Sequence, residues 1–307
     1  MRMPRFEGIF TPLITPITAD EQLDTESLAR LVTFQIAEGV HGLWGMGTTS
    51  EFASFDADER ARLLACTVEA AGGRAPIIAN ISDASTRLAI RHARRAAELG
   101  VDAIAATPPY YYPHSQDELL GHYRAIRDAV DLPLFLYNIP QTVRVRIELP
   151  TATTLAAEGT VAGIKDSQND LEWFRQLALF TRQAEIPFAL FAGTRSLIDA
   201  AVLAGATGAI PSLANAFPAL CVSAFELATS GDFQAAAQQE AQIVAIESAA
   251  GLAAGGSRNA AIISLLKTIL HRRGVIGSAA VTSPLRRFTE DETQQVWERA
   301  QAYVPVE

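Results

Sequence analysis

Short apolar runs alternate with longer amphipathic segments along most of the chain. Eight runs are rich in β-branched, aromatic or small residues and end at glycine, proline or a polar residue: Gly8–Ile14, Gly42–Met46, Pro76–Ile81, Asp102–Thr107, Pro133–Asn138, Val161–Lys165, Phe188–Ala192 and Gly208–Pro211. Continuous apolar runs of this length are typical of strands that are buried on both faces. We therefore predict eight parallel strands.

The segments between these runs carry apolar residues at three- and four-residue spacing, which predicts helices. Asp24 or Thr25 can cap the first helix, and Asp83 or Ser85 can cap the third. Strand followed by helix, repeated eight times over about 230 residues, favours a closed (β/α)8 barrel over an open doubly wound sheet. The clearest helical segments are Thr25–Glu38, Ala57–Ala71, Ser85–Leu99, Gln116–Val130 and Asn169–Gln183.

The last part of the chain has a different pattern. From about Phe233 to Gln301 it contains three helical segments and no strand signal, and no Pro/Ser-rich linker precedes it. We predict an α/β barrel with a C-terminal three-helix extension: a catalytic barrel at residues 1–230, and helices packed on it at residues 231–307. The glycine-rich stretch Gly251–Gly256 is expected to form a flexible turn.

Charge and hydropathy narrow the class of partner. The formal net charge is -9 and no Lys/Arg cluster is present, which argues against nucleic acid or an anionic membrane. No stretch approaches the ~20 apolar residues of a membrane span, and Met1–Glu7 is charged, unlike a signal peptide. We expect a cytoplasmic protein with a small-molecule ligand.

Cysteine and histidine give no sign of a disulfide or a metal site. Cys66 and Cys221 are far apart, and each lies in an apolar helical pattern, so we expect two buried free thiols. The five histidines are scattered and form no spaced pair with cysteine or with one another. We therefore expect no metal site. No glycine-rich phosphate loop follows a predicted strand, so we also expect no nucleotide cofactor.

Lysine usage singles out one residue. The 25 basic residues comprise 23 arginines and two lysines, Lys165 and Lys267. Arginine stays protonated, whereas a desolvated lysine becomes a neutral amine that can attack a carbonyl. Lys165 ends the apolar run Val161–Lys165. It is either a Schiff-base nucleophile or a structural lysine paired with Asp166.

Other conspicuous residues follow neighbouring predicted strands, where barrel enzymes carry their chemistry. Tyr137 ends the fifth strand, beside the sixth, so its hydroxyl could transfer protons near Lys165, unless it is only a core tyrosine. Gly47, Thr48 and Thr49 follow the second strand and could bind a carboxylate through backbone N–H groups and hydroxyls, although an ordinary loop has the same composition. Glu51 is either a cap or a tether for this turn.

An aromatic loop follows the fourth predicted strand. Pro108–Pro113 holds three of the six tyrosines and three prolines. A rigid aromatic loop favours either a subunit interface or packing on the barrel rim.

Taken together, these segments resemble the dihydrodipicolinate synthase / N-acetylneuraminate lyase family. The resemblance extends over essentially the whole chain in order and spacing. It is carried by G-T-T-S-E at 47–51, Y-Y-Y at 110–112, Y-N-I-P at 137–140, G-I-K-D-S at 163–167, Gly205–Ile210, Asn215, Pro218 and Ser283–Leu285.

The resemblance implies a cofactor-free, homotetrameric class I aldolase in which Lys165 forms an imine with pyruvate or another 2-keto acid. Tyr137 matches the proton-transfer tyrosine, and Thr48 matches the threonine that relays protons to it. Thr49 matches the group that holds the keto acid's carboxylate. Tyr111 matches a tyrosine that reaches into the neighbouring subunit's site. Gly47 and Ile210 complete the substrate-binding set that we expect.

Two departures from the family pattern concern the turn and the substrate. Ser50 replaces the second glycine of G-T-T-G-E, a small change that should keep the turn. In synthases of the lysine precursor, an arginine lies five residues after the tyrosine that matches Tyr137, and here that position is Thr142. Arg144 and Arg146 are near, but in an extended segment they would face differently.

The leading hypothesis is therefore a lyase or aldolase that joins or cleaves pyruvate and an aldehyde. Its expected substrate is a 2-keto-3-deoxy sugar acid or a related hydroxy-keto acid. Alternatives are 4-hydroxy-tetrahydrodipicolinate synthase, which joins pyruvate and aspartate semialdehyde, and a keto-acid dehydratase or deaminase of the same family. A non-catalytic keto-acid-binding regulator has no need for both Lys165 and Tyr137.

Overall fold

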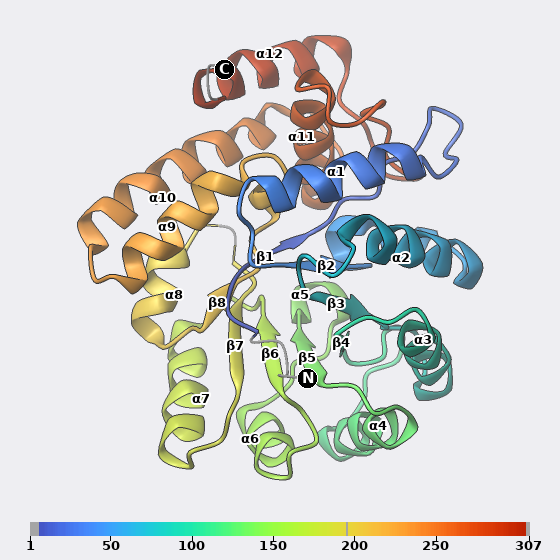
Figure 1. Ribbon diagram of the computed structural model, residues 1–307, viewed down its shortest axis with the longest axis vertical. Coiled ribbons are helices and arrows are strands. Elements are labelled where there is room, and N and C mark those ends of the chain that lie inside the picture. The colour runs from blue at the N-terminus through green and yellow to red at the C-terminus, as the bar shows by residue number, and fades with distance from the viewer. Residues whose placement is uncertain (1–5, 195, 305–307) are drawn as a thin grey trace.

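The chain folds as a closed parallel barrel (Figure 1). The computed structural model describes residues 6–194 and 196–304. Within this part, eight strands pair in chain order and β8 returns to pair with β1. The predicted (β/α)8 barrel is thus confirmed. The strands are β1 Gly8–Pro12, β2 Gly42–Gly45, β3 Ile77–Asn80, β4 Ala103–Ala106, β5 Leu134–Asn138, β6 Gly163–Asp166, β7 Ala189–Ala192 and β8 Gly208–Ala209.

The strands differ from their predicted bounds mainly at the ends. Pro76 and Pro133 fall just before β3 and β5, because proline has no N–H to donate to the ladder. Their carbonyls still accept hydrogen bonds from Leu43 and Ile104 at 2.9 Å. An apolar run therefore overestimates the hydrogen-bonded length of the strand.

Helices follow the strands and surround the barrel. Asp24 caps α1 by accepting from the Ser27 N–H, and Ser85, rather than Asp83, caps α3. The predicted helix Ala57–Ala71 has the same bounds in the structure. The helices are α1 Thr25–Ala37, α2 Ala57–Ala71, α3 Thr86–Glu98, α4 Gln116–Ala129, α5 Pro140–Val143, α6 Leu149–Ala157, α7 Leu171–Gln183, α8 Ile198–Ala204, α9 Pro218–Thr229, α10 Phe233–Glu247, α11 Arg258–Arg272 and α12 Glu290–Ala300.

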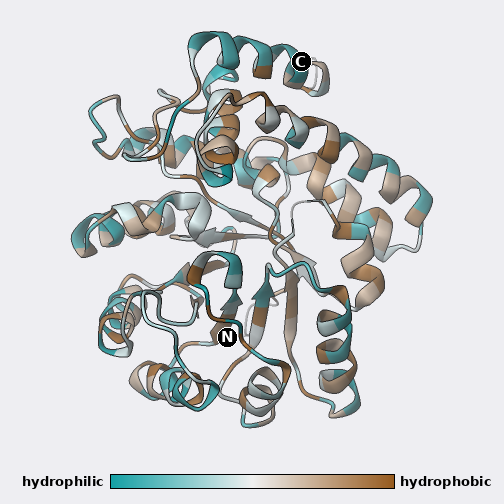
Figure 2. Ribbon diagram, turned by 180° about the vertical axis from the view of Figure 1, so that it is seen from behind, coloured by the Kyte–Doolittle hydropathy of each residue, from teal (hydrophilic) through white to brown (hydrophobic). Residues whose placement is uncertain are grey.

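Alternation along each strand divides the buried side chains into two cores. On β5, Leu134 and Leu136 pack outward against the helices, whereas Phe135 and Tyr137 point into the barrel. Hydrophobic residues line the strands and the inner faces of the helices, while hydrophilic residues lie mostly outside (Figure 2). This alternation sends Tyr137 into the interior of the barrel.

Glycines on the strands leave room for three phenylalanine rings inside the barrel, those of Phe10, Phe135 and Phe191, which together form an aromatic floor. A Cβ atom at Gly42 would come within 2.2 Å of the Phe10 ring, and one at Gly163 within 2.4 Å of the Phe135 ring. Phe10 and Phe135 both pack against Phe191, with ring centroids 5.0 and 6.1 Å apart. The floor fills the barrel with apolar rings and excludes water there.

The C-terminal helices α10, α11 and α12 gather at one side of the barrel (Figure 1). α10 lies against α9, and α11 contacts a short 3-10 helix, Ser212–Asn215, that follows β8. The predicted three-helix extension is confirmed, while the division at residue 230 stays a prediction. Part of Gly251–Gly256 is helical, in the 3-10 helix Ser248–Leu252, and an irregular segment follows it.

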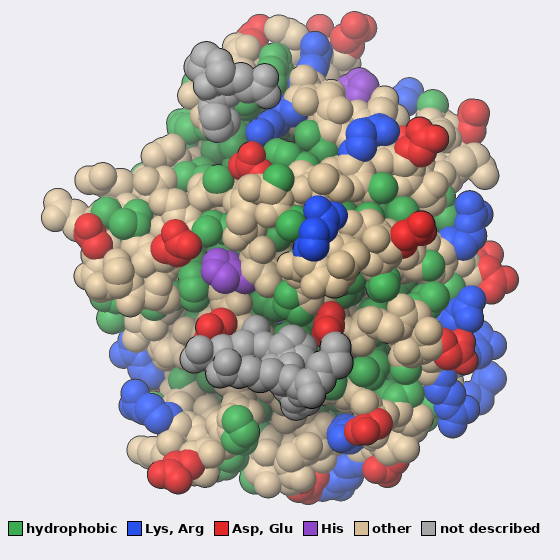
Figure 3. All heavy atoms as spheres, in the orientation of Figure 1, with side chains coloured by type: hydrophobic (Ala, Val, Ile, Leu, Met, Phe, Trp, Pro, Cys, Tyr) green, Lys and Arg blue, Asp and Glu red, His purple; other side chains and the backbone are tan. Residues whose placement is uncertain are grey.

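The outer surface carries both signs of charge. Acidic and basic side chains are interspersed over most of the face in Figure 3. Among the described residues, no helix combines the length and the apolar character that crossing a membrane requires.

Candidate active site

A cavity of about 560 Å³ opens at the carboxyl ends of the strands. Its wall includes five of the seven predicted site residues: Thr48, Thr49, Tyr137, Lys165 and Ile210. Gly47 immediately precedes the two threonines. The structure does not bring Tyr111 to the cavity of its own chain.

Lys165 lies at the bottom of this cavity, between two aromatic rings. In the sheet it pairs with Tyr137 on β5 and with Phe191 on β7. Its Nζ lies 4.5 Å from the centroid of the Tyr137 ring and 4.8 Å from that of Trp44, and the residue is 4% exposed. Burial lowers the pKa of Lys165 to about 7. A large fraction of the amine is therefore neutral at physiological pH.

Asp166 is not the ion-pair partner of Lys165. Strand alternation places its side chain outside the barrel, where Oδ1 accepts a hydrogen bond of 2.8 Å from Asn138 Nδ2. Burial raises the pKa of this carboxyl to about 7. Within the described part of the chain, no carboxylate forms an ion pair with Lys165. The structural alternative for this lysine therefore lacks the contact that it requires.

Tyr137 connects Lys165 to the turn after β2. Its hydroxyl lies 3.1 Å from Thr48 Oγ1, and its ring packs edge-on against Trp44 at 5.4 Å. Burial raises the pKa of Tyr137 to about 12, an effect that the Thr48 and Ser167 hydroxyls beside it partly offset. The phenol is thus protonated at physiological pH, with hydroxyl groups next to it that can relay a proton.

The turn after β2 is a 3-10 helix, Thr48–Ser50, and hydrogen bonds of Ser50 hold it in place. Ser50 Oγ accepts from the Gly47 N–H at 3.1 Å and donates to the Leu13 carbonyl at 2.5 Å. The Thr15 hydroxyl donates to the Ser50 carbonyl. The serine that replaces glycine keeps the turn, as expected, and also ties it to the segment after β1.

Glu51 tethers the same turn to the C-terminal extension. Its Oε1 lies 2.5 Å from Lys267 Nζ on α11, and both side chains are fully buried. Its Oε2 accepts from the Thr282 N–H and hydroxyl, at 2.7 and 2.8 Å. Glu51 also has a left-handed backbone, with φ 60°. The structure shows both roles predicted for Glu51: its backbone N–H caps the 3-10 helix Thr48–Ser50, and its side chain is the tether.

Two residues near Lys165 are not among the predicted site residues: Gly193, which follows β7, and Ser167, which follows β6. A Cβ atom at Gly193 would lie 2.0 Å from Ser167 Oγ and 3.1 Å from Lys165 Cε. The missing side chain thus makes room for Ser167 beside Tyr137 and for the lysine itself. A glycine directly after a predicted barrel strand was the available signal for this close approach.

The aromatic loop after β4 projects from the molecule. Tyr111 is 85% exposed and has a left-handed backbone, with φ 90°, and Tyr112 is 67% exposed. Tyr110 instead packs against Phe52, with 6.3 Å between ring centroids. Exposed neighbouring aromatic rings of this kind are typical of a contact surface.

The segment after β5 places Thr142, and neither nearby arginine, at the cavity. Thr142 lies on α5 and lines the wall. Arg146 forms an ion pair with Asp170 at 3.0 Å, and Arg144 takes a left-handed backbone, with φ 61°, that ends α5. Neither arginine lines the cavity, as expected, although residues 140–143 are helical and not extended as the expectation assumed.

The two cysteines, expected as buried free thiols, form no disulfide with each other. Cys66 and Cys221 are free, and Cys66 is only half-buried. Within residues 6–194 and 196–304, no three His, Cys, Asp or Glu residues form a group able to hold a metal ion.

The chain matches one protein family along nearly its whole length. The model of the dihydrodipicolinate synthetase family covers residues 5–303. The chain belongs to this family. The family comprises class I, pyruvate-dependent lyases, and the chain is an enzyme of that class.

Relatives within the dihydrodipicolinate synthetase family carry two kinds of name. An uncharacterised DapA-like lyase of Halobacterium salinarum is 31% identical over 93% of this chain and 90% of its own. A 4-hydroxy-tetrahydrodipicolinate synthase of Phenylobacterium zucineum is 36% identical over 80% of this chain and 82% of its own.

Solved structures of the family share the fold. Dihydrodipicolinate synthase from Bacteroides thetaiotaomicron superposes with a TM-score of 0.91 at 32% identity, covering 98% of this chain and 100% of its own. YagE, a prophage protein of the family from E. coli, was solved in complex with pyruvate. It superposes with a TM-score of 0.90 at 26% identity, covering 97% of this chain and 98% of its own.

Proposed function

We propose that Lys165 captures pyruvate as a Schiff base and that the enzyme makes or breaks a C–C bond at pyruvate C3. The observation that carries this proposal is a buried amine at the bottom of a strand-end cavity, with no carboxylate partner among the described residues. Its neutral form attacks the C2 carbonyl, and loss of water gives a protonated imine. The imine withdraws electrons from C3, so a C3–C4 bond can break to leave an enamine.

Tyr137 and Thr48 are proposed to move the protons of these steps. The protonated phenol donates to the carbinolamine oxygen that leaves as water, and the Thr48 hydroxyl at 3.1 Å returns a proton to it. In the cleavage direction the same pair accepts the proton of the C4 hydroxyl as the aldehyde forms. Gly47 and Thr49 would bind the pyruvate carboxylate, and Ile210 would pack on its carbon chain.

The substrate that we favour is a 2-keto-3-deoxy sugar acid or a related hydroxy-keto acid. Thr142 lines the cavity where the lysine-precursor synthases place an arginine, so this wall provides a hydroxyl instead of a cation. The names of several relatives favour a second candidate, 4-hydroxy-tetrahydrodipicolinate synthase. An assay of pyruvate release from 2-keto-3-deoxygluconate, beside a synthase assay with aspartate semialdehyde, separates the two.

The Schiff base itself is tested by reduction with borohydride. With pyruvate, wild-type protein should gain one pyruvyl adduct on Lys165, and Lys165→Ala should gain none. Product analysis then distinguishes aldol cleavage from dehydration or deamination of the same imine. An adduct confined to Lys267, or no adduct at all, would refute the proposal.

We also propose a homotetramer in which Tyr111 enters the site of a neighbouring subunit. Its 85% exposure in one chain supports this role. Tyr111→Ala and Lys165→Ala should each be inactive, whereas a mixture of the two refolded together should regain activity at sites that combine both intact residues. Full activity of Tyr111→Ala alone would contradict the shared site.

A further inference from the structure

One wall of the catalytic cavity comes from the C-terminal extension. Arg258 and Asn259, in the first turn of α11, line this wall together with Ile262 and Ile263. Arg258 is exposed, and Ser257 begins the helix by accepting a hydrogen bond from the Ala260 N–H. The cavity therefore runs from Lys165 on β6 to a guanidinium on a helix outside the barrel.

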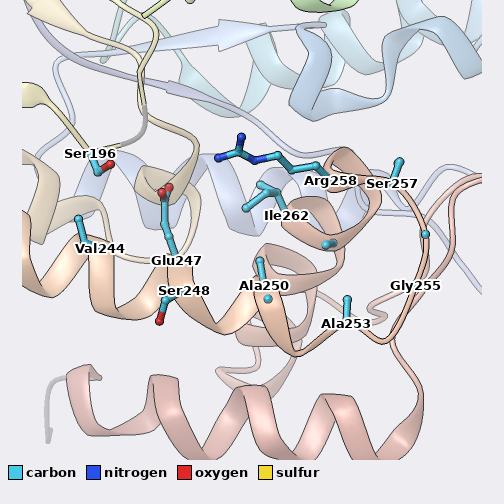
Figure 4. A pocket seen from close by; sticks show the side chains of 13 residues that line it. Ser196, Val244, Glu247, Ser248, Ala250, Ala253, Gly255, Ser257, Arg258 and Ile262 are labelled. Atoms are coloured by element: carbon cyan, nitrogen blue, oxygen red, sulfur yellow. The ribbon is translucent and has the colours of Figure 1, made fainter.

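Among the described residues, Arg258 has no ion-pair or hydrogen-bond partner. Figure 4 shows its side chain extending from α11 past Ile262, on the side of Ser196 and Glu247. No ion pair joins Arg258 to Glu247, and Arg258 makes no hydrogen bond within the described chain. A guanidinium is a planar fork of donors that matches a carboxylate with two parallel hydrogen bonds.

The cavity is also larger than pyruvate requires. At about 30 Å³ for each water-sized group, 560 Å³ holds well over a dozen such groups, whereas pyruvate has six heavy atoms. The part near α11 is thus available to the other end of a longer substrate. Gln168, Asn169 and Asn259 add amide groups to this part of the wall.

The charges on the wall bear on which end group fits: Arg258 and Glu247 both line it, and Glu247 has an interaction of its own. The keto acid's own carboxylate is placed at Thr49, and Lys165 is consumed in the imine, so neither can neutralise a second acid. Among the described residues, Arg258 is the only arginine on the wall. The amino end of α11, a helix of 15 residues, adds its partial positive charge there.

We propose that Arg258 binds a carboxylate at the distal end of the substrate, which narrows the proposed hydroxy-keto acids to those with a second acid group and disfavours monoacids such as 2-keto-3-deoxygluconate. This inference rests on the proposed function, because it takes the imine at Lys165 as the fixed end. Arg258 is here a specificity residue: it replaces, from another element, the cation that position 142 lacks. The aldehyde released or consumed would then carry an acid group.

The test uses keto acids that differ only at the far end, so it needs no knowledge of the natural substrate. Half-saturating concentrations for borohydride trapping at Lys165 are measured with 2-oxoglutarate and 2-oxopentanoate, and with 2-oxoadipate and 2-oxohexanoate. In wild type at least one diacid should be trapped at a concentration about tenfold or more below its monoacid, as a charge-assisted pair provides. Arg258→Gln should abolish this preference, and Arg258→Lys should keep part of it.

Arg272→Gln is the matched control, since Arg272 is exposed at the other end of α11 and its side chain hydrogen-bonds only Gln294 among the described residues. It should retain the diacid preference. Equal trapping of diacids and monoacids by wild type, or an unchanged preference in Arg258→Gln, overturns the assignment. Absence of any pyruvate adduct in wild type instead refutes the Schiff-base proposal, so the two failures are distinguishable.

Discussion

Glu51 and Lys267 form a fully buried ion pair, with 2.5 Å between Oε1 and Nζ. The pair joins the turn that carries Thr48 and Thr49 to helix α11, whose first turn also lines the cavity. The ion pair thus ties together two distant segments of the chain that line the same cavity.

Glu51→Gln should destabilise the protein by about 3–5 kcal/mol, because it leaves the Lys267 charge buried without a counter-charge. Glutamine can still accept hydrogen bonds from Thr282, so the loss isolates the ion pair. Urea unfolding measures it. The double variant Glu51→Gln/Lys267→Met, which removes both charges, should recover much of the loss. Wild-type stability of the single variant would contradict the prediction.

The rate of pyruvate trapping at Lys165 should rise as the pH increases through about 7 and then level off. The sign follows from burial, which favours the neutral, nucleophilic amine and lowers its pKa. An ordinary lysine would continue to gain reactivity up to about pH 10. Single-turnover trapping at a series of pH values provides the profile, and an inflection near 10 would show that the amine is solvated.

Tyr137→Phe should slow trapping and turnover by about 10²- to 10⁴-fold with little loss of stability, since it removes one hydroxyl from a proton relay. Tyr123→Phe is the matched control. Tyr123 is also fully buried, but its hydroxyl donates to the Ala106 carbonyl at 3.2 Å, outside the cavity. Equal rates for the two variants would remove Tyr137 from the mechanism.

Gly193→Ala should cost about 1–3 kcal/mol of stability and reduce trapping, because the added methyl group overlaps Ser167 and crowds Lys165. Gly121→Ala serves as the control. Gly121 lies on the exposed side of α4 with open space around it, so alanine there should stabilise by about 0.5–1 kcal/mol. Thermal unfolding and trapping of both variants check the pair. A Gly193→Ala protein as stable and reactive as wild type would show that the close approach is unimportant.

The barrel and the centre of its site follow from local patterns. Eight apolar runs predict the strands, and strand order alone places Tyr137 beside Lys165, because consecutive strands are neighbours in such a barrel. The period of two then sends both side chains to the interior, where they meet.

The remaining site residues depend on contacts that no local pattern encodes. Glu51 meets Lys267 and Thr282 only after the extension has packed on the barrel, and Arg258 reaches the cavity for the same reason. The segment after β5 folds into the short helix α5 through tertiary context, which turns Thr142 toward the cavity and leaves Arg146 to pair with Asp170. Amphipathic pattern predicts that α11 exists, but not which wall it builds.

The scarcity of lysine has a practical consequence for chemical labelling. Lys165 is 4% exposed and Lys267 is fully buried, so the folded chain offers no lysine amine on its outer surface. Lys267 is also held by Glu51, whereas Lys165 faces an open cavity. A small amine-reactive fluorophore at neutral pH should therefore modify one lysine in the native protein, Lys165, and a bound keto acid should block that reaction. The Lys165 labelling that a keto acid blocks, read at the Lys165 peptide so that the reactive N-terminal amine is left out, would count the active sites that the keto acid occupies.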